Sequence, residues 1–589
     1  MNSSQLISII FFILVILIIG FDIIKYGLSE LLEYEVKIEF LVTISTIGAC
    51  LLGNFAEGAV LMLLFFVAEY LEDFALDQSK KSMVDLVKLR PDIACVKKDG
   101  YEIEVKVEDL SIGDIVIVKP GDKVPIDGVI IKGSSSINQA SITGESFPVD
   151  KSVGDEVYSS TINQEGYFEF KVTKISDETI FSKIIELIKE SEDKKAKIDL
   201  FIDKFAKYYT PTIIILAILV AIIPYLIFGL SFKEWIYKSL VLLVISCPCA
   251  LAISTPVSMV SAITAGTKNG IIIKGGEYIE ELSKIKAISF DKTGTLTEGN
   301  LVIEDIKTFN GVCVEDLMKI VCSIENNSNH PIAKLFKDYS IENNILISEL
   351  DEFNSINGLG LEGSIGGVNY LVGKKELIGM EVIGSHLDIP LSNIHVFIAQ
   401  ENNLIGFISL SDKIRSNTKS TISNLSKKSI KTFMLTGDND DNAFKVANTI
   451  GIDNYYSNLM PKDKVQKVQE LVKKYGNLVM VGDGVNDSPS LAQANVGIAM
   501  GLDGADIAIE TADIILTNDD ISKVGYLVDL SKKTMVVVKQ NISVSLLVKS
   551  SLAILAVIGF LSLGEAIIFG DVGLTLIVVL NALRISKNY

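Results

Sequence analysis

Histidine, cysteine and tryptophan are scarce in this sequence, which has three, six and one of them among 589 residues. Only Cys247 and Cys249 are close neighbours, so no disulfide framework is indicated and the soluble parts are expected to face a reducing cytoplasm. Basic residues are outnumbered, with 54 Lys and Arg against 73 Asp and Glu. The net charge of −19 disfavours nucleic acid as a partner. The sequence also lacks a Walker A element, internal repeats and low-complexity tracts.

Apolar runs are plentiful instead, since 49% of the residues are hydrophobic. A membrane span needs roughly 20 apolar residues, and about seven runs qualify. They lie near residues 5–24, 39–56, 58–76, 211–230, 237–258, 541–562 and 565–584. The first run has no basic stretch before it and no small-residue cleavage site after it, so we interpret it as a retained span rather than a signal peptide.

Two long polar stretches, near 78–205 and 265–535, separate these runs, and their Lys and Arg content indicates the cytoplasmic side. The first stretch is rich in short β-branched runs divided by Pro-Gly and Asp-Gly turns. The second alternates strand-like and helix-like patterns, which is typical of an α/β domain. We therefore predict a multi-domain membrane protein with an α-helical transmembrane bundle and two cytoplasmic parts.

Three predicted strands of the second polar stretch each run into a polar loop. "AISF" ends at Asp291 in "DKTGTLT", "TFML" ends at Thr436 in "TGDN", and "LVMV" ends at "GDGVND", which holds Asp483 and Asp487. Because ligand groups gather at the carboxyl ends of parallel strands, we expect these loops to converge. Carboxylates suit Mg²⁺, while glycine amides, a threonine and Lys464 of "MPKDK" suit phosphate. An aspartate beside both could act as a nucleophile and form an aspartyl-phosphate.

The order of "DKTGTLT", "TGDN" and "GDGVND" resembles the phosphorylation domain of P-type ATPases. The alternative is an ordinary α/β sheet with polar loop ends. The resemblance implies a haloacid-dehalogenase-like fold in which Asp291 accepts the γ-phosphoryl group of ATP, with Thr436 and Lys464 steadying it. The implied Mg²⁺ ligands are Asp291, Thr293, Asp483 and Asp487, and Gly437 and Asp438 are implied to contact the nucleotide.

A segment near 299–405 contains "ENNSNHP" and "NGLGLEG". The second formally matches a dinucleotide pattern, but the following "SIGGVNYLVG" predicts a hairpin rather than a helix, so the Rossmann context fails. The resemblance to heavy-metal P-type ATPases implies an α+β nucleotide-binding insert that uses Glu325, His330, Gly358 and Gly360. Taken alone, His330 would be a surface histidine before a proline.

The first polar stretch contains "SITGESFPV". An isolated Thr-Gly-Glu is a common turn, but its place between the third and fourth spans resembles the actuator loop of the same family. The resemblance implies that Glu145 positions water for hydrolysis of the aspartyl-phosphate.

The fifth apolar run contains "VISCPCALAIS". Pro248 removes a backbone donor, and freed backbone groups inside a membrane are tolerated where they line a cavity or find a ligand. Because thiolates select soft or borderline cations, Cys247 and Cys249 predict a mid-membrane metal site. The alternative is a kinked core helix with two small buried cysteines.

The last two runs place Lys549 and Asp571 at membrane depth, where charges are costly and usually functional. Two thiolates and one carboxylate carry a formal charge of −3, so a divalent ion leaves about −1, which Lys549 neutralises. Lys549 could also pair with Asp571 when no metal is bound. The Lys and Asp-x-Gly pattern resembles the Zn²⁺/Cd²⁺/Pb²⁺ subgroup, while the Asn-Tyr and Met-x-x-Ser-Ser elements of copper pumps are missing.

Glu57 and Glu69 lie at the two ends of the third span, roughly 18 Å apart along a helix. Either they line the cation pathway, with Glu57 at the release side, or they mark the membrane boundary.

We predict transmembrane helices 1–3 over residues 1–77 and a β-rich actuator domain over 78–204. Helices 4–5, with Cys-Pro-Cys, follow over 205–262. The phosphorylation domain takes 263–298 and 408–535, the nucleotide-binding domain 299–407, and helices 6–7 residues 536–589. Compared with the eight spans usual in the family, we expect the first span and an N-terminal metal-binding domain to be missing.

The resulting prediction is a monomeric plasma-membrane pump with cytoplasmic catalytic domains. It would use ATP and Mg²⁺ to export Zn²⁺, Cd²⁺ or Pb²⁺ through the lipid bilayer, with a soluble metal donor as a possible partner. The alternatives are a Cu⁺ exporter, or a membrane phosphatase or metal sensor that does not transport.

Overall fold

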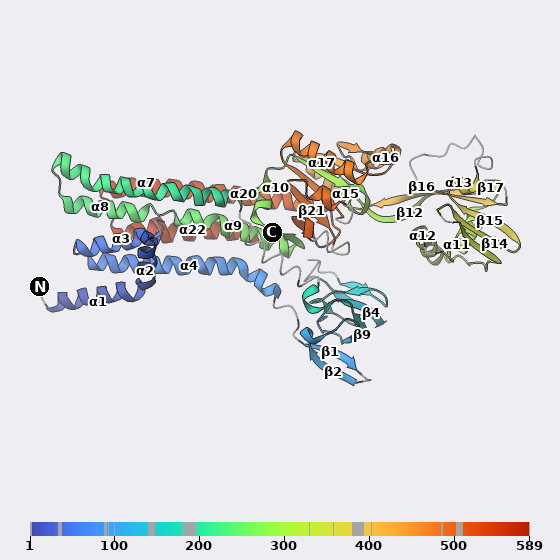
Figure 1. The fold of residues 1–589 in the computed structure, drawn as a ribbon, viewed down its shortest axis with the longest axis horizontal. Coiled ribbons are helices and arrows are strands. Elements are labelled where there is room, and N and C mark those ends of the chain that lie inside the picture. Colours follow the sequence, from blue (N-terminus) through green and yellow to red (C-terminus); the bar gives the residue numbers. More distant parts are fainter. Residues whose placement is uncertain are drawn as a thin grey trace. The chain divides into compact units, whose positions relative to one another are not determined.

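The fold was analysed in a computed structural model (Figure 1). It describes residues 3–32, 38–87, 91, 93–98, 101–139, 148–179, 182, 196–328, 330–356, 358–379, 394–401, 403–483, 487–501 and 510–587. The chain divides into two compact units. Unit 1 comprises Met1–Lys284, Asp513–Asn518 and Tyr526–Tyr589, and unit 2 comprises Ile285–Ala512 and Asp519–Gly525.

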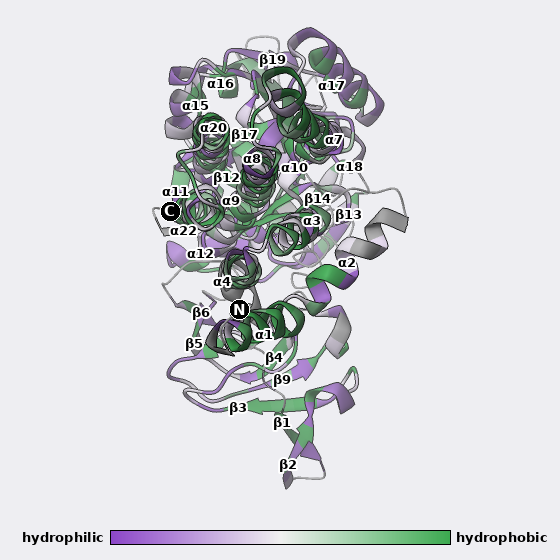
Figure 2. Cartoon of the chain, turned by 90° about the vertical axis from the view of Figure 1, so that its left-hand side faces the viewer, coloured by the Kyte–Doolittle hydropathy of each residue, from purple (hydrophilic) through white to green (hydrophobic). Residues whose placement is uncertain are grey.

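Apolar helices of different lengths form the larger part of unit 1, and Figure 2 colours most of their residues as hydrophobic. They are α1 (Ser3–Ile19), α2 (Phe21–Leu32), α3 (Ile38–Leu51), α4 (Phe55–Val87), α7 (Lys197–Phe228), α8 (Phe232–Ile245), α9 (Cys249–Lys268), α20 (Ser522–Ile558), α21 (Leu563–Ile567) and α22 (Gly573–Lys587). Among the described residues, four helices are long and apolar enough to cross a membrane, or five if the bent pair α1–α2 is one span. The shorter apolar stretch Glu39–Leu51 lies within α3.

The helices agree with the apolar runs of the sequence, but their ends differ. Helices α3 and α4 form the expected hairpin, with Gly53 at a positive φ of 89° in the turn. Helix α4 continues to Val87, well past the predicted end at residue 76, because its sequence stays helix-forming after the apolar part ends. Helices α1 and α2 meet at Gly20 with a bend of 65°. A side chain at Gly20 would lie 2.9 Å from the Met62 sulfur, so the glycine permits close packing against α4.

The first polar stretch is built from two antiparallel sheets, as its β-branched runs predict. The six-stranded sheet has the order β2-β1-β3-β9-β4-β7, and the three-stranded sheet has the order β6-β5-β8. Their strands are β1 (Ile93–Lys98), β2 (Tyr101–Lys106), β3 (Ile115–Val118), β4 (Gly128–Gly133), β5 (Ser135–Asn138), β6 (Val149–Lys151), β7 (Glu156–Val157), β8 (Ile162–Asn163) and β9 (Phe168–Val172). Short 3₁₀ turns are η1 (Val107–Asp109) and η2 (Ser176–Glu178). Alternating side chains, including Val116, Phe168 and Phe170, fill the core between the strands.

Unit 2 contains a parallel sheet flanked by helices. Its strands are β11 (Ala287–Asp291), β18 (Lys431–Leu435), β19 (Asn454–Tyr456), β20 (Leu478–Gly482) and β21 (Val496–Met500), in the order β21-β20-β11-β18-β19. The helices are α15 (Thr418–Lys427), α16 (Asp440–Ile450), α17 (Pro461–Tyr475) and α18 (Ser488–Leu491). Strands β11 and β20 are buried along their whole length, which explains their continuous apolar sequence. In unit 1, β10 (Ile271–Ile273) pairs with β22 (Ile514–Leu516), and α10 (Gly276–Ser283) follows β10.

An antiparallel sheet with the order β12-β17-β16-β15-β14-β13 forms the rest of unit 2. Its strands are β12 (Thr297–Thr308), β13 (Glu352–Ile356), β14 (Gly360–Ile365), β15 (Val368–Gly373), β16 (Ile394–Gln400) and β17 (Asn403–Ile414), accompanied by α11 (Val314–Glu325), α12 (Pro331–Glu342) and α13 (Lys375–Ile378). Strands β14 and β15 are the predicted hairpin, with Gly366 and Gly367 at positive φ in its turn. No helix follows the glycine loop at once, which confirms that it is not a Rossmann element.

Candidate functional site

The Cys-Pro-Cys segment is a break between two helices. Helix α8 ends at Ile245 and α9 begins at Cys249, so Cys247 and Pro248 lie in the unwound turn. The Cys247 N–H still donates to the Val244 carbonyl at 3.3 Å, whereas Pro248 has no N–H to donate. The break therefore leaves backbone carbonyls turned toward the interior of the helix bundle, as the sequence predicts.

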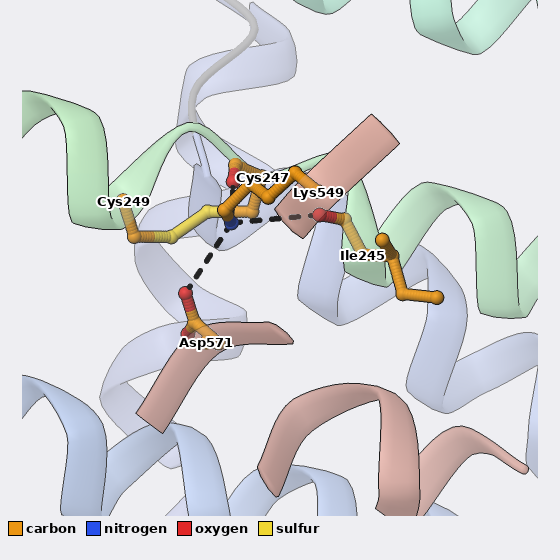
Figure 3. The surroundings of a disulfide bond; sticks show 5 residues. All are labelled: Ile245, Cys247, Cys249, Lys549 and Asp571. Carbon is orange, nitrogen blue, oxygen red and sulfur yellow. Dashed lines mark hydrogen bonds and ion pairs between the residues drawn. A yellow bond between two sulfur atoms is a disulfide. The ribbon is translucent and has the colours of Figure 1, made fainter. Parts of the chain in front are cut away.

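The three predicted metal ligands meet at this break (Figure 3). The ligand atoms of Cys247, Cys249 and Asp571 all lie within 4.8 Å of one another. The two sulfurs are joined as a disulfide, which the sequence analysis did not expect; the turn brings the two Cα atoms to 5.5 Å, close enough for the bond. Metal binding requires the reduced pair, because only the thiolate is a ligand. A thiolate pair with one carboxylate is a donor set that suits a borderline divalent cation.

Lys549 reaches the same place from α20. Its Nζ donates to the carbonyls of Cys247 and, at 3.4 Å, of Ile245, and it lies 3.7 Å from Oδ1 of Asp571. The side chains of Lys549 and Asp571 are each only 9% exposed. The ammonium therefore pairs with the carboxylate, as predicted, and also satisfies backbone carbonyls beside the helix break, which was not predicted.

Asp571 lies in a single wider turn, the π-helix η4 (Ile568–Val572), between α21 and α22. The Gly573 N–H donates to the Ile568 carbonyl, five residues earlier. A side chain at Gly573 would lie 2.7 Å from that oxygen, so the glycine of Asp-x-Gly allows the turn to close. The extra residue in the turn sets the direction of the Asp571 carboxylate.

The two pathway candidates on α4 differ. Glu57 lies in the first turn of α4, beside the Tyr237 hydroxyl, and its Oε2 is buried without a hydrogen-bond partner. Glu69 is exposed on the same helix. Neither residue belongs to the cluster of Cys247, Cys249 and Asp571.

The second site lies in unit 2, at the carboxyl ends of its parallel strands. Strand β11 pairs in parallel with β18 on one side and β20 on the other, so the loops after Asp291, Leu435 and Gly482 share one edge. This is the convergence that the sequence predicts. Asp291 and Thr436 are both buried there.

Lys464 connects two carboxylates at this edge. Its Nζ is 2.5 Å from Oδ1 of Asp291 and 3.0 Å from Oδ1 of Asp487. Pro461 in the first turn of α17 and the bond from the Met460 N–H to the Asp463 carboxylate start the helix that carries it. Burial, together with the Asp487 charge, raises the pKa of Asp291 to about 7. Burial alone would lower the pKa of Lys464, but the two carboxylates raise it.

The residues present fit Mg²⁺. Asp487 is fully buried, and its Oδ2 has no hydrogen-bond partner. Such an orphaned carboxylate oxygen suits a hard cation. Asp483 lies close by, since a Cβ at Gly294 would be 3.3 Å from its Oδ2, while Thr293 is exposed on the same loop. Bound there, Mg²⁺ would neutralise charge on the transferred phosphate.

The "TGDN" loop is held by a further ion pair. Lys292 lies 2.5 Å from Oδ2 of Asp438, which also accepts a bond from the Asn442 amide. The Asp438 N–H donates to Oγ1 of Thr436 at 3.1 Å, and Gly437 between them is exposed. The lysine after Asp291 thus orients this loop, a role that the sequence analysis missed.

The four nucleotide residues predicted in the insert line one cavity of about 260 Å³ at the ends of β14, β15 and β16, whereas Gly437 and Asp438 do not border it. Glu325, His330, Gly358 and Gly360 all border it, and so does Lys374, which was not predicted. A side chain at Gly360 would lie 2.4 Å from the Val372 carbonyl, so only glycine fits. Lys374 directly follows Gly373, which pairs with Gly360 across the hairpin. No motif around Lys374 predicts that it borders the cavity.

Glu325 and His330 have different surroundings in this cavity. Glu325 is 5% exposed, and burial raises the pKa of its carboxyl to about 7, although Lys337 lowers it. His330 is exposed and caps α12, because its Nδ1 accepts a bond of 3.3 Å from the Ile332 N–H. A buried carboxyl in a cavity is a candidate for contact with a ligand.

The predicted actuator residue Glu145 lies outside the described residues. The roles of the remaining site residues stay predictions. Sequence reasoning also missed Asp412 and Arg415, which bind the loop after Asp291 from more than a hundred residues away. Nothing in the sequence "SDKIR" predicts that Asp412 and Arg415 contact residues 294–297, because the contact depends on how the strands of the sheet pair.

Comparisons with known proteins show which proteins this chain resembles. Residues 88–189 match the P-type ATPase actuator domain, and residues 285–495 match the haloacid dehalogenase-like hydrolases. A cadmium-transporting ATPase of Staphylococcus aureus is 41% identical over 600 residues, covering 100% of this chain and 82% of that protein. A zinc-transporting ATPase of Bacillus subtilis is 35% identical and covers 100% of this chain and 93% of that protein. The crystal structure of a zinc-transporting PIB-type ATPase in the E2.Pi state has 32% identity and a TM-score of 0.69, covering 99% and 96% of the two chains.

Proposed function

The chain belongs to the metal-transporting P-type ATPases, and from that premise we propose that it exports Zn²⁺, Cd²⁺ and Pb²⁺ from the cytoplasm across the plasma membrane. ATP hydrolysis drives the transport. Zn²⁺ and Cd²⁺ are the cations named for the related proteins, and Pb²⁺ follows from the same soft-donor chemistry. In this proposal the protein is embedded in the lipid bilayer, and its partner in the cytoplasm is a soluble metal donor.

The observation that carries this proposal is the cluster of Cys247, Cys249 and Asp571 with Lys549 beside it. Reduced, the three ligands hold a formal charge of −3, and Lys549 brings this to −2. A divalent cation then neutralises the cluster, whereas Cu⁺ would leave a net negative charge buried in the bundle, which is costly. The charge balance therefore favours divalent over monovalent cargo.

Transport requires that the cluster and the phosphorylation site respond to each other. The cation enters from the cytoplasm and binds the reduced cysteines, and Asp291 attacks the γ-phosphorus of ATP. The bond to ADP breaks and an aspartyl-phosphate forms, while Lys464 steadies the transferred group. Release of the cation outward precedes hydrolysis, for which Glu145 positions water. The coupling is reciprocal, because each ligand shifts the same equilibrium between two states.

Reconstituted vesicles and a metal panel test the proposal. We expect ATP hydrolysis and metal uptake into inside-out vesicles to rise with Zn²⁺, Cd²⁺ and Pb²⁺ in a thiol-containing buffer. Stimulation by Cu⁺ alone would identify a copper exporter. Hydrolysis without uptake would identify a phosphatase or sensor, and either result would overturn the proposal.

A further inference from the structure

The loop that follows Asp291 is clamped by one arginine. Arg415 donates from Nε to the Thr295 carbonyl at 3.1 Å and from Nη2 to the Gly294 carbonyl at 2.9 Å. Its backbone N–H also donates to the Leu296 carbonyl at 3.1 Å. The side chain is only 14% exposed, so these bonds are shielded from water. The guanidinium thus fixes the backbone three to four residues after the nucleophile.

The clamped stretch also borders the third strand end. Gly294 has a φ of +73°, and a Cβ there would lie 3.3 Å from both Cβ and Oδ2 of Asp483. The backbone at Gly294 therefore passes close to Asp483, a predicted Mg²⁺ ligand, and leaves no room there for a larger side chain. The backbone that Arg415 holds is part of the geometry that phosphorylation must change.

The same guanidinium reaches the start of α20. Its Nη2 lies 3.1 Å from Oδ2 of Asp519. The next residue, Asp520, accepts bonds from the N–H and hydroxyl of Ser522, at 2.9 and 2.7 Å, and so caps the helix. The Asn417 amide donates to Asp520 at 3.2 Å, and the Lys428 ammonium donates to the Gly525 carbonyl at 3.3 Å. The first turn of α20 is therefore attached to the segment that carries Arg415.

Helix α20 runs unbroken from Ser522 to Ile558 and carries Lys549. From its first turn to Lys549 is roughly 40 Å at 1.5 Å per residue. Because a continuous helix moves as a stiff rod, a displacement of its capped end reaches the ammonium that lies beside Cys247 and Asp571.

From these contacts we infer that Arg415 is a positioning residue that couples phosphorylation of Asp291 to the cation site through Asp519 and α20. The inference rests on the proposed function, since it assigns a residue to the link that transport needs. Arginine suits the task because its rigid fork binds two carbonyls and a carboxylate at once. Lysine is a point charge on a flexible stem and cannot hold all three in one plane.

The test is the Zn²⁺ concentration that gives half-maximal phosphorylation of the full chain by radiolabelled ATP. We expect Arg415→Lys to shift this midpoint by about tenfold. Asp519→Asn should shift it by about threefold, because Asp519 is 55% exposed and its ion pair is screened. The KM for ATP should stay within about twofold in both. The double variant should shift no further than Arg415→Lys, since the two residues act on one contact.

Lys413→Ala is the matched control. Lys413 lies two residues before Arg415 and pairs with Glu298 at 3.1 Å, an ion pair of the same segment that does not reach α20. The Zn²⁺ concentration for half-maximal phosphorylation of Lys413→Ala should equal that of the wild type. Melting temperatures of all variants separate a shift in coupling from a loss of folding, and Asp519→Asn carries the test if Arg415→Lys does not fold.

Unshifted midpoints in Asp519→Asn and Arg415→Lys, or shifts that add in full in the double variant, would overturn the role of Arg415. A wild-type chain that is not phosphorylated in response to Zn²⁺ would instead overturn the proposed function. The two failures are therefore distinguishable.

Discussion

Two buried lysines, one in each unit, show how the same residue type serves two sites. Lys464 lies between the carboxylates of Asp291 and Asp487. Lys549 lies between the Asp571 carboxylate and the carbonyls of Ile245 and Cys247. Both ammonium groups offset acidic charge where a cation is expected, but their acceptors differ in kind.

The two lysines differ in whether they keep their contacts when phosphate or a metal ion binds beside them. Lys464 balances two fixed carboxylates and still has a partner when phosphate arrives, so it can remain in place. Lys549 occupies acceptors that belong to the helix break, directly beside the cysteine ligands. A metal ion in the cluster repels its ammonium and takes over the Asp571 carboxylate, so Lys549 must give up that contact as the cation binds while its charge stays beside the cluster. We therefore expect Lys464 to support chemistry and Lys549 to support release.

The largest effect should come from the nucleophile beside Lys464. Asp291→Asn keeps the shape of the side chain but removes the attacking carboxylate, so phosphorylation and turnover should fall by at least about a thousandfold. Acid-stable incorporation of phosphate measures this loss directly. Zn²⁺ binding by the same variant should persist, and its loss would contradict the assignment of the cation site to Cys247, Cys249 and Asp571.

Lys464→Met removes the fixed charge between two carboxylates. We expect the phosphorylation rate to fall by about a hundredfold, since the transferred group loses one charged contact and Asp291 and Asp487 repel each other. Single-turnover labelling at saturating Zn²⁺ measures it. Lys462→Met, which changes an exposed lysine of the same helix, is the control and should label normally.

Lys549→Ala tests the difference between the two lysines, because this change should leave the phosphorylation of Asp291 unaffected. The cluster then keeps its acidic charge without an internal partner, so Zn²⁺ should bind about tenfold more tightly and leave more slowly. Dephosphorylation that is slowed while Asp291 labels at its normal rate would support this. A Zn²⁺ midpoint equal to that of the wild type would contradict the displacement of Lys549.

The smallest effect concerns the nucleotide cavity and pH. Burial raises the pKa of Glu325 to about 7, above its ordinary value. An amine of a bound base donates to the ionised carboxylate, so the ionised form should bind more tightly. The KM for ATP should therefore rise as the pH falls from about 8 to 6, by at most about tenfold. In Glu325→Gln the KM for ATP should not change with pH. If the KM of this variant rises with falling pH as in the wild type, Glu325 does not cause the pH dependence.

The sequence predicts the convergence of the three strand ends well because the signal is local. Each strand of four or five apolar residues ends at its functional residue, and parallel pairing brings the ends of β11, β18 and β20 together. The β14–β15 hairpin follows from its glycine turn in the same way. The Cys-Pro-Cys break agrees with the position of Pro248, but Pro211, Pro224 and Pro256 lie inside continuous helices, so a proline does not by itself predict a break.

What the sequence misses depends on long-range contact. The carbonyls bound by Lys549 lie some three hundred residues earlier, and Arg415 clamps a loop more than a hundred residues away. The π-turn at Asp571 depends on packing, and α4 extends to Val87 through helix-forming residues that carry no apolar pattern. These contacts and helix irregularities leave no periodic pattern in the sequence that would predict them.

The most direct test of the account joins the two sites in one measurement. Cys247 and Cys249 are replaced together by serine, and phosphorylation of Asp291 by ATP is followed as Zn²⁺ is added under reducing conditions. The account predicts that Zn²⁺ no longer stimulates labelling, while labelling by inorganic phosphate in the absence of metal persists. Zn²⁺-dependent labelling with the wild-type midpoint would contradict the claim that the sulfur cluster controls the aspartyl-phosphate.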